Sequence, residues 1–292
     1  MAPGLTESTE NMADKYAVIG NPIAHSKSPF IHAEFARQTR HDIAYGRILG
    51  NPDDFAGNVR RFFAAGGRGM NVTLPFKEQA WKLVDERGPR AEHIGAVNTL
   101  SLLPDGRLGG DNTDGIGLVR DLSANHGFGF DSKQVLLLGA GGASRGVLLS
   151  LLETGLDTLV IANRTAAKAL DLVAATATDR VSGCGLEGLS GQRFDLIINA
   201  TSAGLDGRAP AIPQDCLAVG GWIYDMFYSD MPTPFLRWGR ERGAARTLDG
   251  LGMLVEQAAE SFSLWRGVRP ATSPVIAQLR GGSVRPPVFS LK

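Results

Sequence analysis

The chain has 292 residues, and its 30 lysine and arginine residues are balanced by 30 aspartate and glutamate residues. This length suits about two domains, each with its own core, and two domains leave a cleft between them. The balanced charge excludes an overall attraction to nucleic acid or to an anionic membrane, so any anion must be recognised locally.

The two cysteines, Cys184 and Cys216, are far apart in the sequence and form no CxxC pair, and the five histidines are scattered without ligand spacing. We therefore expect no disulfide framework, no metal ion and a reducing, cytoplasmic location. Residues 1–15 are polar and lack the apolar core of a signal peptide, and no later run could span a bilayer. We predict a disordered tail there, with Met12 as an alternative start.

The first third of the chain alternates short apolar runs with helical patterns. Strands are predicted at 16–20, 43–49 and 69–74, with helices at 28–38 and 53–66 between them. This β-α-β-α-β order is typical of a mostly parallel sheet covered by helices. In such a sheet the functional groups lie at the carboxyl ends of the strands.

A glycine-rich hairpin is predicted at 96–115, and the helix after it leads to a second alternating series that begins at Gln134. We therefore place the domain boundary near Asp114. A last helical pattern runs over 252–267, and the Pro-rich end of the chain has no periodicity. The predicted organisation is a first domain of residues 16–114 with 251–280, a second domain of residues 115–250, and a tail at 281–292.

The segment QVLLLGAGGASRG, residues 134–146, has the pattern of a strand, a glycine turn and a helix start. Gly139 and Gly141 occupy the first two positions of G-x-G-x-x-G, and Ser144 stands at the third. The first glycine permits a tight turn, and the second lets the backbone approach a pyrophosphate at the helix N-terminus. The motif alone is weak, because a glycine turn without a ligand would look the same.

The next apolar run, TLVIAN, strengthens the case for a dinucleotide site. An NAD site expects an acidic residue about 20 residues past the glycines. This chain has no acid there but has Asn163, Arg164 and Thr165, with Lys168 one helical turn on. A guanidinium can grip a 2′-phosphate through charge-assisted hydrogen bonds, so Arg164 favours NADP. The alternative is a solvated surface charge.

Two further apolar runs end in small polar or thioether side chains at the predicted sheet edge. Thr201, Ser202, Ala203 and Gly204 follow the first run, and Met226 follows the second. They could border the nicotinamide, because the carboxyl ends of strands line the cofactor crevice in an open α/β sheet. Ordinary loop residues are an equally good interpretation.

Hydroxyl groups gather at the start of the first predicted helix. Ser28 followed by Pro29 is typical of a helix N-cap and first helical position, so a structural role would explain Ser28. A helix N-terminus also attracts anions, and Ser26 adds a second hydroxyl. A small carboxylate could be held here.

Lys77 opens a predicted helix just after Thr73 and Pro75. A lysine is unfavourable at a helix start, so stability alone does not explain it. If the predicted hairpin runs back along the sheet, it brings further polar residues to the same edge. These are Asn98, Asp111, Asn112 and Asp114, and Asp114 would also suit a plain turn.

Nine short motifs occur in the order of one known family. They are GNPIAHSKSP, NVTLPFKE, GAVNT, GDNTDG, GAGGASRG, NRT, NATSAG, YDMFY and DGLGMLVEQAA. The chain resembles the shikimate dehydrogenase family from Tyr16 to about Gln278. The resemblance implies an α/β fold with an N-terminal substrate-binding domain, a Rossmann-type NADP-binding domain, and a C-terminal helix that packs back on the first domain. It also implies reversible NADPH-dependent reduction of 3-dehydroshikimate to shikimate in aromatic amino acid biosynthesis, by a monomer or homodimer.

The resemblance also implies roles for single residues. The substrate carboxylate would be bound by Ser26, Ser28 and Tyr228. Ring hydroxyls would be held by Thr73, Asn98, Asp114 and Gln257. The catalytic pair would be Lys77 and Asp114, and which of the two carries the proton stays open. The cofactor would be held by Gly139, Ala140, Gly141, Gly142, Ala143, Asn163, Arg164, Thr165, Lys168, Thr201, Met226 and Gly250.

Other functions compete with this interpretation. A quinate/shikimate dehydrogenase of broader specificity often has threonine at Ser28 and an acid at Arg164, so both residues argue against it. A silent NADP-binding regulator would lack Lys77 or Asp114, and both are present. A short-chain dehydrogenase is disfavoured because no Tyr-x-x-x-Lys occurs.

Overall fold

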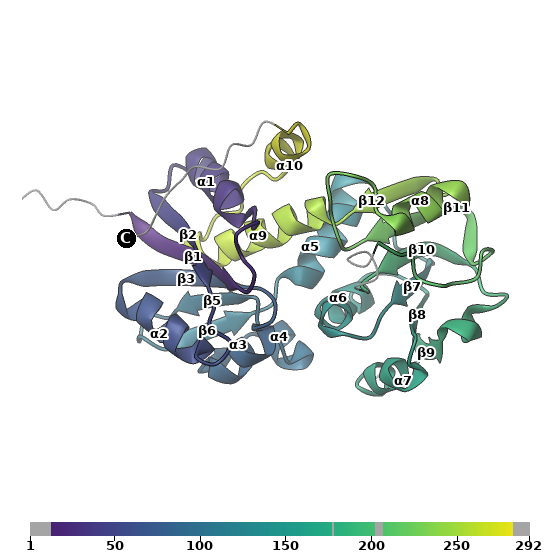
Figure 1. Cartoon of the computed structure of the whole chain (residues 1–292), viewed down its shortest axis with the longest axis horizontal. Coiled ribbons are helices and arrows are strands. Elements are labelled where there is room, and N and C mark those ends of the chain that lie inside the picture. The colour runs from purple at the N-terminus through teal and green to yellow at the C-terminus, as the bar shows by residue number, and fades with distance from the viewer. Residues whose placement is uncertain (1–12, 177, 202–206, 283–292) are drawn as a thin grey trace, which may run out of the picture.

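The structure, a computed structural model, describes residues 13–176, 178–201 and 207–282. Two α/β domains lie side by side, and two helices run between them: α5 (Asp114–Arg120) and α9 (Leu251–Arg266) (Figure 1). No helix in the described ranges is long and apolar enough to cross a membrane. The first domain comes from both ends of the described chain, because α9 returns to it after the second domain.

The first domain is built on a mixed six-stranded sheet in the order β2-β1-β3-β5-β6-β4. β1 pairs in parallel with β2 and β3, as the β-α-β-α-β pattern predicts. β5 and β6 form the predicted hairpin, and a short connection allows only antiparallel pairing. The strands are β1 Asp14–Gly20, β2 Ile43–Leu49, β3 Gly67–Val72, β4 Glu86–Arg87, β5 Thr99–Leu102 and β6 Leu108–Asp111.

Helices cover both faces of this sheet. One face carries a core that includes Phe55 and Phe76, from the segments of α2 and α3. The other is covered by α1 and α9, with Phe35 packed edge-on against Phe262. The return of the last long helix to the first domain is therefore confirmed. The helices are α1 Ser28–Thr39, α2 Phe55–Ala64, α3 Lys77–Leu83, α4 Pro89–Ile94 and α10 Ser273–Arg280.

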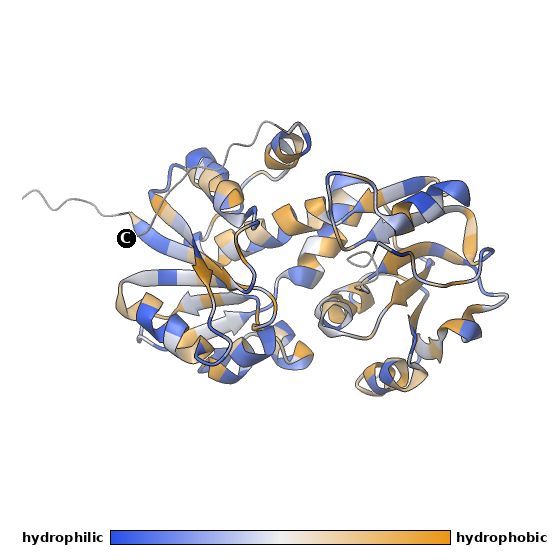
Figure 2. Ribbon diagram, viewed as in Figure 1, coloured by the Kyte–Doolittle hydropathy of each residue, from blue (hydrophilic) through white to orange (hydrophobic). Residues whose placement is uncertain are grey.

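The second domain is built on a parallel sheet in the order β12-β11-β10-β7-β8-β9. Counted along the chain, this is the strand order of a doubly wound dinucleotide-binding fold, with its switch point between β7 and β10. The middle strands are apolar on both faces because helices cover both (Figure 2). The strands are β7 Gln134–Leu138, β8 Thr158–Asn163, β9 Val181–Gly185, β10 Phe194–Asn199, β11 Leu217–Asp225 and β12 Arg246–Asp249.

The remaining helical segments of the second domain are short, and several were not predicted from the sequence. The longest, α6, begins at Gly142 directly after the glycine turn. The segments are α6 Gly142–Leu152, α7 Ala166–Ala174 and α8 Pro234–Glu241, with a π-helical turn at Asp121–Asn125 and a 3₁₀ turn at Leu186–Leu189.

Two local predictions were wrong. β1 begins at Asp14, inside the segment predicted as a tail, because Asp14 pairs with Ile43 of β2 and its carboxylate forms an ion pair with Arg266. Ser28 is the first residue of α1 and not its N-cap: the N-cap is Lys27, and no side chain caps the helix. Residues 1–12 and 283–292 of the predicted tails lie outside the described residues.

The close crossing of α5 and α9 depends on Gly117. A Cβ atom at Gly117 would lie 2.8 Å from the Cβ of Gln257 and 2.8 Å from the carbonyl oxygen of Met253. Both distances are well inside van der Waals contact. The helix that begins at Asp114 can therefore lie against the helix that carries Gln257 only because residue 117 has no side chain.

We expect Gly117→Ala to lower the free energy of unfolding by about 1–2 kcal/mol, because overpacking costs more than the ~1 kcal/mol that alanine gains in a helix. Thermal or urea unfolding measures the change. Gly129→Ala is the matched control, since no heavy atom of the described residues lies within 4 Å of a Cβ there and its φ is not positive. Equal free energies of unfolding for the two variants would show that α5 and α9 leave space for a side chain at position 117.

Candidate active site

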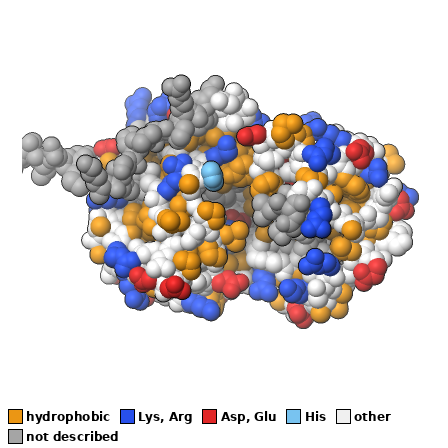
Figure 3. Space-filling model, viewed as in Figure 1, with side chains coloured by type: hydrophobic (Ala, Val, Ile, Leu, Met, Phe, Trp, Pro, Cys, Tyr) orange, Lys and Arg blue, Asp and Glu red, His pale blue; other side chains and the backbone are white. Residues whose placement is uncertain are grey.

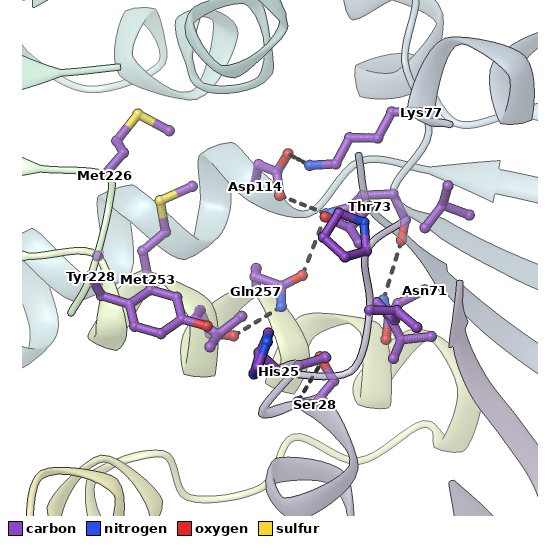
Figure 4. A pocket seen from close by; sticks show the side chains of 18 residues that line it. His25, Ser28, Asn71, Thr73, Lys77, Asp114, Met226, Tyr228, Met253 and Gln257 are labelled. Carbon is purple, nitrogen blue, oxygen red and sulfur yellow. Dashed lines mark hydrogen bonds and ion pairs between the residues drawn. The ribbon is translucent and has the colours of Figure 1, made fainter. Parts of the chain in front are cut away.

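A cavity of about 370 Å³ lies between the two domains. The space-filling view shows the molecule hollowed at this place (Figure 3), and Figure 4 shows the side chains that surround it. Strand ends of the first domain, the start of α5, one face of α9 and two loops of the second domain all contribute. The lining residues are Val18, Pro22, Ile23, His25, Ser26, Ser28, Asn71, Val72, Thr73, Lys77, Asn98, Asp114, Met226, Tyr228, Gly250, Met253, Leu254 and Gln257.

The centre of the cavity holds an ion pair between Lys77 and Asp114 (Figure 4). Lys77 opens α3, and its Nζ lies 2.5 Å from Oδ2 of Asp114, which opens α5. The carboxylate is favourable at its helix N-terminus, whereas the lysine is unfavourable at its own. The side chains are 28% and 12% exposed, so the pair is screened from water yet open to the cavity. A proton donor and its counter-ion therefore face the cavity together.

Asn98 orients the carboxylate of Asp114. Its Nδ2 donates to Oδ1 of Asp114 at 2.8 Å, while its Oδ1 accepts from the backbone N–H of Thr113 at 3.0 Å. Asp114 thus uses one oxygen for Asn98 and the other for Lys77. Gln257, on α9, completes this wall, with its Oε1 3.4 Å from Nδ2 of Asn98. These hydrogen bonds hold the polar side chains in one arrangement, in which the Lys77 ammonium already faces the cavity.

Two residues of the GDNTDG motif do not reach the cavity. Asn112 is buried, donates to the carbonyl of Ala96 at 3.1 Å and accepts from the N–H of Asp114. Asp111 forms an ion pair with Arg90, 3.5 Å from Nη2. The expectation that these two side chains would meet the others at the site edge was therefore too broad. They shape the turn that places Asp114.

The opposite end of the cavity is rich in hydroxyl groups. The backbone N–H of Ser28 donates to Oγ of Ser26 at 3.3 Å, so both serines lie together at the N-terminus of α1. Tyr228 comes from the second domain and also lines this cavity. Burial raises the pKa of the Tyr228 hydroxyl, which keeps it protonated and able to donate a hydrogen bond.

A buried layer lies beneath this end of the cavity. The Tyr45 hydroxyl donates to Oδ1 of Asn71 at 2.7 Å, and Nδ2 of Asn71 donates to Oγ of Ser261 at 3.0 Å. His32 stacks on Tyr45 with ring centroids 4.2 Å apart. Neither nitrogen of His32 has a hydrogen bond of good geometry to any residue in the described ranges. His32 is thus a neutral packing group and not a ligand.

His32 makes folding stability depend on pH. Burial lowers the pKa of His32 to about 3, against a smaller upward effect of the Asn71 amide. The ordinary pKa of a histidine, which applies to the unfolded chain, is 6.5. Between pH 6.5 and about pH 3 only the unfolded chain binds the proton, so the free energy of unfolding falls as the pH drops below 6.5. This one group should cost about 1.6 kcal/mol between pH 6.5 and about pH 5. Denaturant titrations of wild type and His32→Phe would test this, and an identical pH slope would contradict it.

The corner between β7 and α6 has the shape of a phosphate cradle. Gly139 has φ +104°, a conformation that disfavours a side chain, and its carbonyl accepts from Oγ of Ser144 at 2.8 Å. Among the described residues, no heavy atom lies within 4 Å of where a Cβ would stand at Gly141 or Gly142, and no side chain caps α6. The first N–H groups of α6 are therefore without a side-chain cap among the described residues, which fits a pyrophosphate.

The corner between β8 and α7 fits a 2′-phosphate. Nδ2 of Asn163 donates to the carbonyl of Thr165 at 3.0 Å and holds the turn. Arg164, Thr165 and Lys168 are exposed. Within the ranges that the structure describes, neither the side chain of Arg164 nor that of Lys168 forms a hydrogen bond or an ion pair. Two cations without counter-ions thus flank the predicted adenosine end of the cofactor.

A buried carboxylate holds the loops at the other cofactor end. Asp225 is fully buried and accepts from Nδ2 of Asn199 at 3.0 Å and from Oγ1 of Thr233 at 2.6 Å. Burial raises the pKa of Asp225, which these hydrogen bonds partly offset. Asn199 in turn accepts from the hydroxyl of Thr201 at 2.7 Å. The loops after β10 and β11 are therefore tied together next to the switch point between β7 and β10.

Met226 and Gly250 connect the cofactor edge to the cavity, since both line it. A Cβ at Gly250 would overlap the carbonyl group of Met226, so only glycine fits there. Ser202, Ala203 and Gly204, which the sequence also placed near the nicotinamide, lie outside the described residues. The second domain thus reaches the cavity at the ends of β11 and β12.

Three family models match successive parts of the chain. They describe the shikimate dehydrogenase substrate binding domain (residues 18–100), shikimate/quinate 5-dehydrogenase (122–206) and the shikimate 5′-dehydrogenase C-terminal domain (250–280). The chain is 60% identical over 270 residues to the NADP(+) shikimate dehydrogenase of Alkalilimnicola ehrlichii, a match that covers 92% of this chain and 99% of that relative. The chain belongs to the shikimate dehydrogenase family. The enzyme of the same name from Methylococcus capsulatus is 56% identical, and the match covers 96% of that relative.

Solved structures show the shikimate dehydrogenase fold over both domains. An Ael1 enzyme from Pseudomonas putida has a TM-score of 0.87 at 50% identity and covers 91% of this chain and 98% of its own. Shikimate 5-dehydrogenase from Thermus thermophilus, solved with NADP(H) and shikimate, has a TM-score of 0.82 at 35% identity and covers 92% and 99%. The two-domain α/β architecture is therefore confirmed.

The seven residues predicted to bind substrate and the catalytic Lys77 all line one cavity. Sequence reasoning missed three polar residues that support them: Asn71, Asn199 and Asp225. Asn71 could have been found, because it lies two positions before Thr73 and both line the cavity. Asn199 and Asp225 end apolar strands, and only the strand order shows that they meet.

Proposed function

We propose that this protein is an NADP-dependent shikimate dehydrogenase that reversibly reduces 3-dehydroshikimate to shikimate. The observation that carries the proposal is the Lys77–Asp114 pair, which lies in a cavity between the two domains. Met226 and Gly250 bring the end of the dinucleotide-binding sheet to the same cavity. A proton donor and a hydride source would then meet at one carbonyl group.

The cavity suits a small polyhydroxylated acid. Its volume of about 370 Å³ is in the range of small-molecule sites. In the proposed orientation the carboxylate lies at Ser26, Ser28 and Tyr228, where hydroxyl donors and a helix N-terminus favour an anion. The ring hydroxyls then face the opposite wall, which is formed by Thr73, Asn98, Asp114 and Gln257.

The reduction needs a hydride on the carbonyl carbon and a proton on its oxygen. NADPH, when bound, supplies the hydride. In the proposed mechanism the Lys77 ammonium donates its proton to the carbonyl oxygen as that oxygen becomes a hydroxyl, and Asp114 holds Lys77 in place. Asn98 keeps Asp114 from turning away, because it binds the other carboxylate oxygen. In the oxidation direction, neutral Lys77 removes the hydroxyl proton.

The cofactor would lie along the carboxyl edge of the second sheet. Its pyrophosphate would be held by residues Gly139 to Ala143, where the cradle is open. Its 2′-phosphate would be bound by Arg164, with Asn163, Thr165 and Lys168 around it. Thr201, Met226 and Gly250 would border the nicotinamide, since two of them also line the substrate cavity. A cytoplasmic location and a monomer or homodimer stay predictions.

Initial rates with shikimate or quinate, each with NADP⁺ or NAD⁺, test the proposal on the purified protein. Fast turnover only with shikimate and NADP⁺ is the expected result. Comparable rates with quinate or NAD⁺ would point to the broader quinate/shikimate branch, a possibility that the family model of residues 122–206 includes by its description. No turnover with any pair would contradict the proposal and favour a silent NADP-binding regulator.

A further inference from the structure

Arg47 lies behind the serine end of the cavity, on strand β2. Its Nε and Nη2 donate to the carbonyl oxygen of Ser26 at 3.1 and 2.6 Å. Arg47 pairs in register with Val18, which lines the cavity, whereas Arg47 itself does not. The guanidinium therefore contacts Ser26 without lining the cavity itself, and Nε and Nη2 both donate to this one loop carbonyl.

The charge of Arg47 has no counter-ion among the described residues. The side chain is half-buried, and no carboxylate in those ranges lies within 4.0 Å of it. Among the described residues, its side chain donates only to the neutral carbonyl of Ser26. A charge removed from water is costly unless an opposite charge compensates for it. The same place also receives the positive end of α1, which begins at Ser28. This end of the cavity is thus electropositive before any ligand binds.

We propose that Arg47 is a positioning residue for the substrate carboxylate. It holds the Ser26 carbonyl in place, so that the Ser26 hydroxyl faces the cavity. It also supplies the positive charge that compensates for the negative charge of the bound carboxylate. The inference rests on the proposed function, since it concerns the anionic end of that substrate. Ser26, Ser28 and Tyr228 offer neutral donors only, so none of them could replace this charge.

A purely structural role of Arg47 and a role of its charge predict different results. If Arg47 only held the Ser26 loop in place, its replacement would affect the binding of a charged and of an uncharged substrate equally. If its positive charge matters, the replacement would affect mainly the charged substrate, and this effect weakens with salt because ions screen the charge. The methyl ester of shikimate keeps the ring and its hydroxyls but carries no charge. It therefore separates the two roles.

The first experiment uses the unchanged protein with saturating NADP⁺. KM for shikimate should rise about threefold between low salt and roughly 0.5 M NaCl, whereas KM for the methyl ester should change less than about 1.5-fold. Equal salt dependence of the two substrates would overturn the proposal. This measurement does not depend on whether any variant folds.

The second experiment compares Arg47→Met, Arg47→Lys and the control Arg60→Met. Arg60 is exposed on α2, and its side chain forms no hydrogen bond or ion pair with any residue in the described ranges. Arg47→Met should raise KM for shikimate about tenfold with kcat and KM for NADP⁺ within about twofold, and should lower kcat/KM for the ester less than about threefold. Arg47→Lys keeps the charge but loses the two-nitrogen fork, so its KM for shikimate should lie between those of wild type and Arg47→Met. Arg60→Met should match wild type.

Equal losses with shikimate and its ester in Arg47→Met would overturn the proposal, and so would a lysine variant as impaired as the methionine variant. Failure here is distinct from failure of the proposed function. If wild type turns over shikimate but Arg47→Met behaves like Arg60→Met, only this inference falls. If wild type does not turn over shikimate, both fall.

Discussion

Replacing Lys77 with methionine is expected to lower kcat by about 10²- to 10⁴-fold, the usual contribution of a positioned proton donor. The Nζ of Lys77 is the proton donor nearest to Asp114 in the cavity, and methionine keeps the length of the side chain without the ammonium. Initial rates at saturating shikimate and NADP⁺ measure the effect. Lys82→Met, on the exposed part of the same helix α3, is the matched control and should leave kcat unchanged.

A loss smaller than about tenfold would contradict the role of Lys77 as proton donor. Asp114→Asn sharpens the test, because asparagine can still accept from Asn98 but no longer balances the lysine charge. If Lys77 and Asp114 act as one unit, the double variant should be no slower than the slower single variant. Multiplying losses would show that the two residues contribute separately.

Reversing the charge of Arg164 is expected to change the cofactor preference. Arg164→Asp should lower kcat/KM for NADP⁺ at least about tenfold and that for NAD⁺ less than about threefold, because a carboxylate repels the 2′-phosphate and can accept from a ribose hydroxyl. The ratio of the two kcat/KM values is the quantity to measure. Arg60→Asp, in the other domain, controls for the change in net charge. An unchanged ratio would mean that Arg164 is a solvated surface charge.

The second sheet was largely predictable from the sequence. Its central strands are continuous apolar runs, and such runs between turn residues occur where a strand is covered on both faces. The glycine turn after Leu138 and the basic residues after Asn163 could be placed for the same reason, since each follows directly from a strand end. Short elements such as β4, α4 and α10 were missed, because two to eight residues give too little periodicity.

Local pattern was a poorer guide where tertiary contacts decide the conformation. Ser28 has the composition of an N-cap, yet α1 begins with it, and its neighbours are Ser26 and the cavity. Asp14 lies in a polar segment, yet it extends β1 because β2 and Arg266 offer it partners. The contacts of Asp14 come from distant parts of the chain, whereas Ser28 donates to Ser26 two positions away and faces a cavity that several elements build.

The sequence by itself determined the strand ends, the glycine turn and the residue types that could serve a dehydrogenase, because these depend on neighbours within a few positions. Only the tertiary structure decided which strand ends meet. Lys77 and Asp114 are 37 positions apart and are joined because the β5–β6 hairpin returns along the sheet. Gln257 joins them from 143 positions further along the chain than Asp114, through the close approach that Gly117 permits. Such distances in space follow from strand order and helix packing, which no local pattern contains.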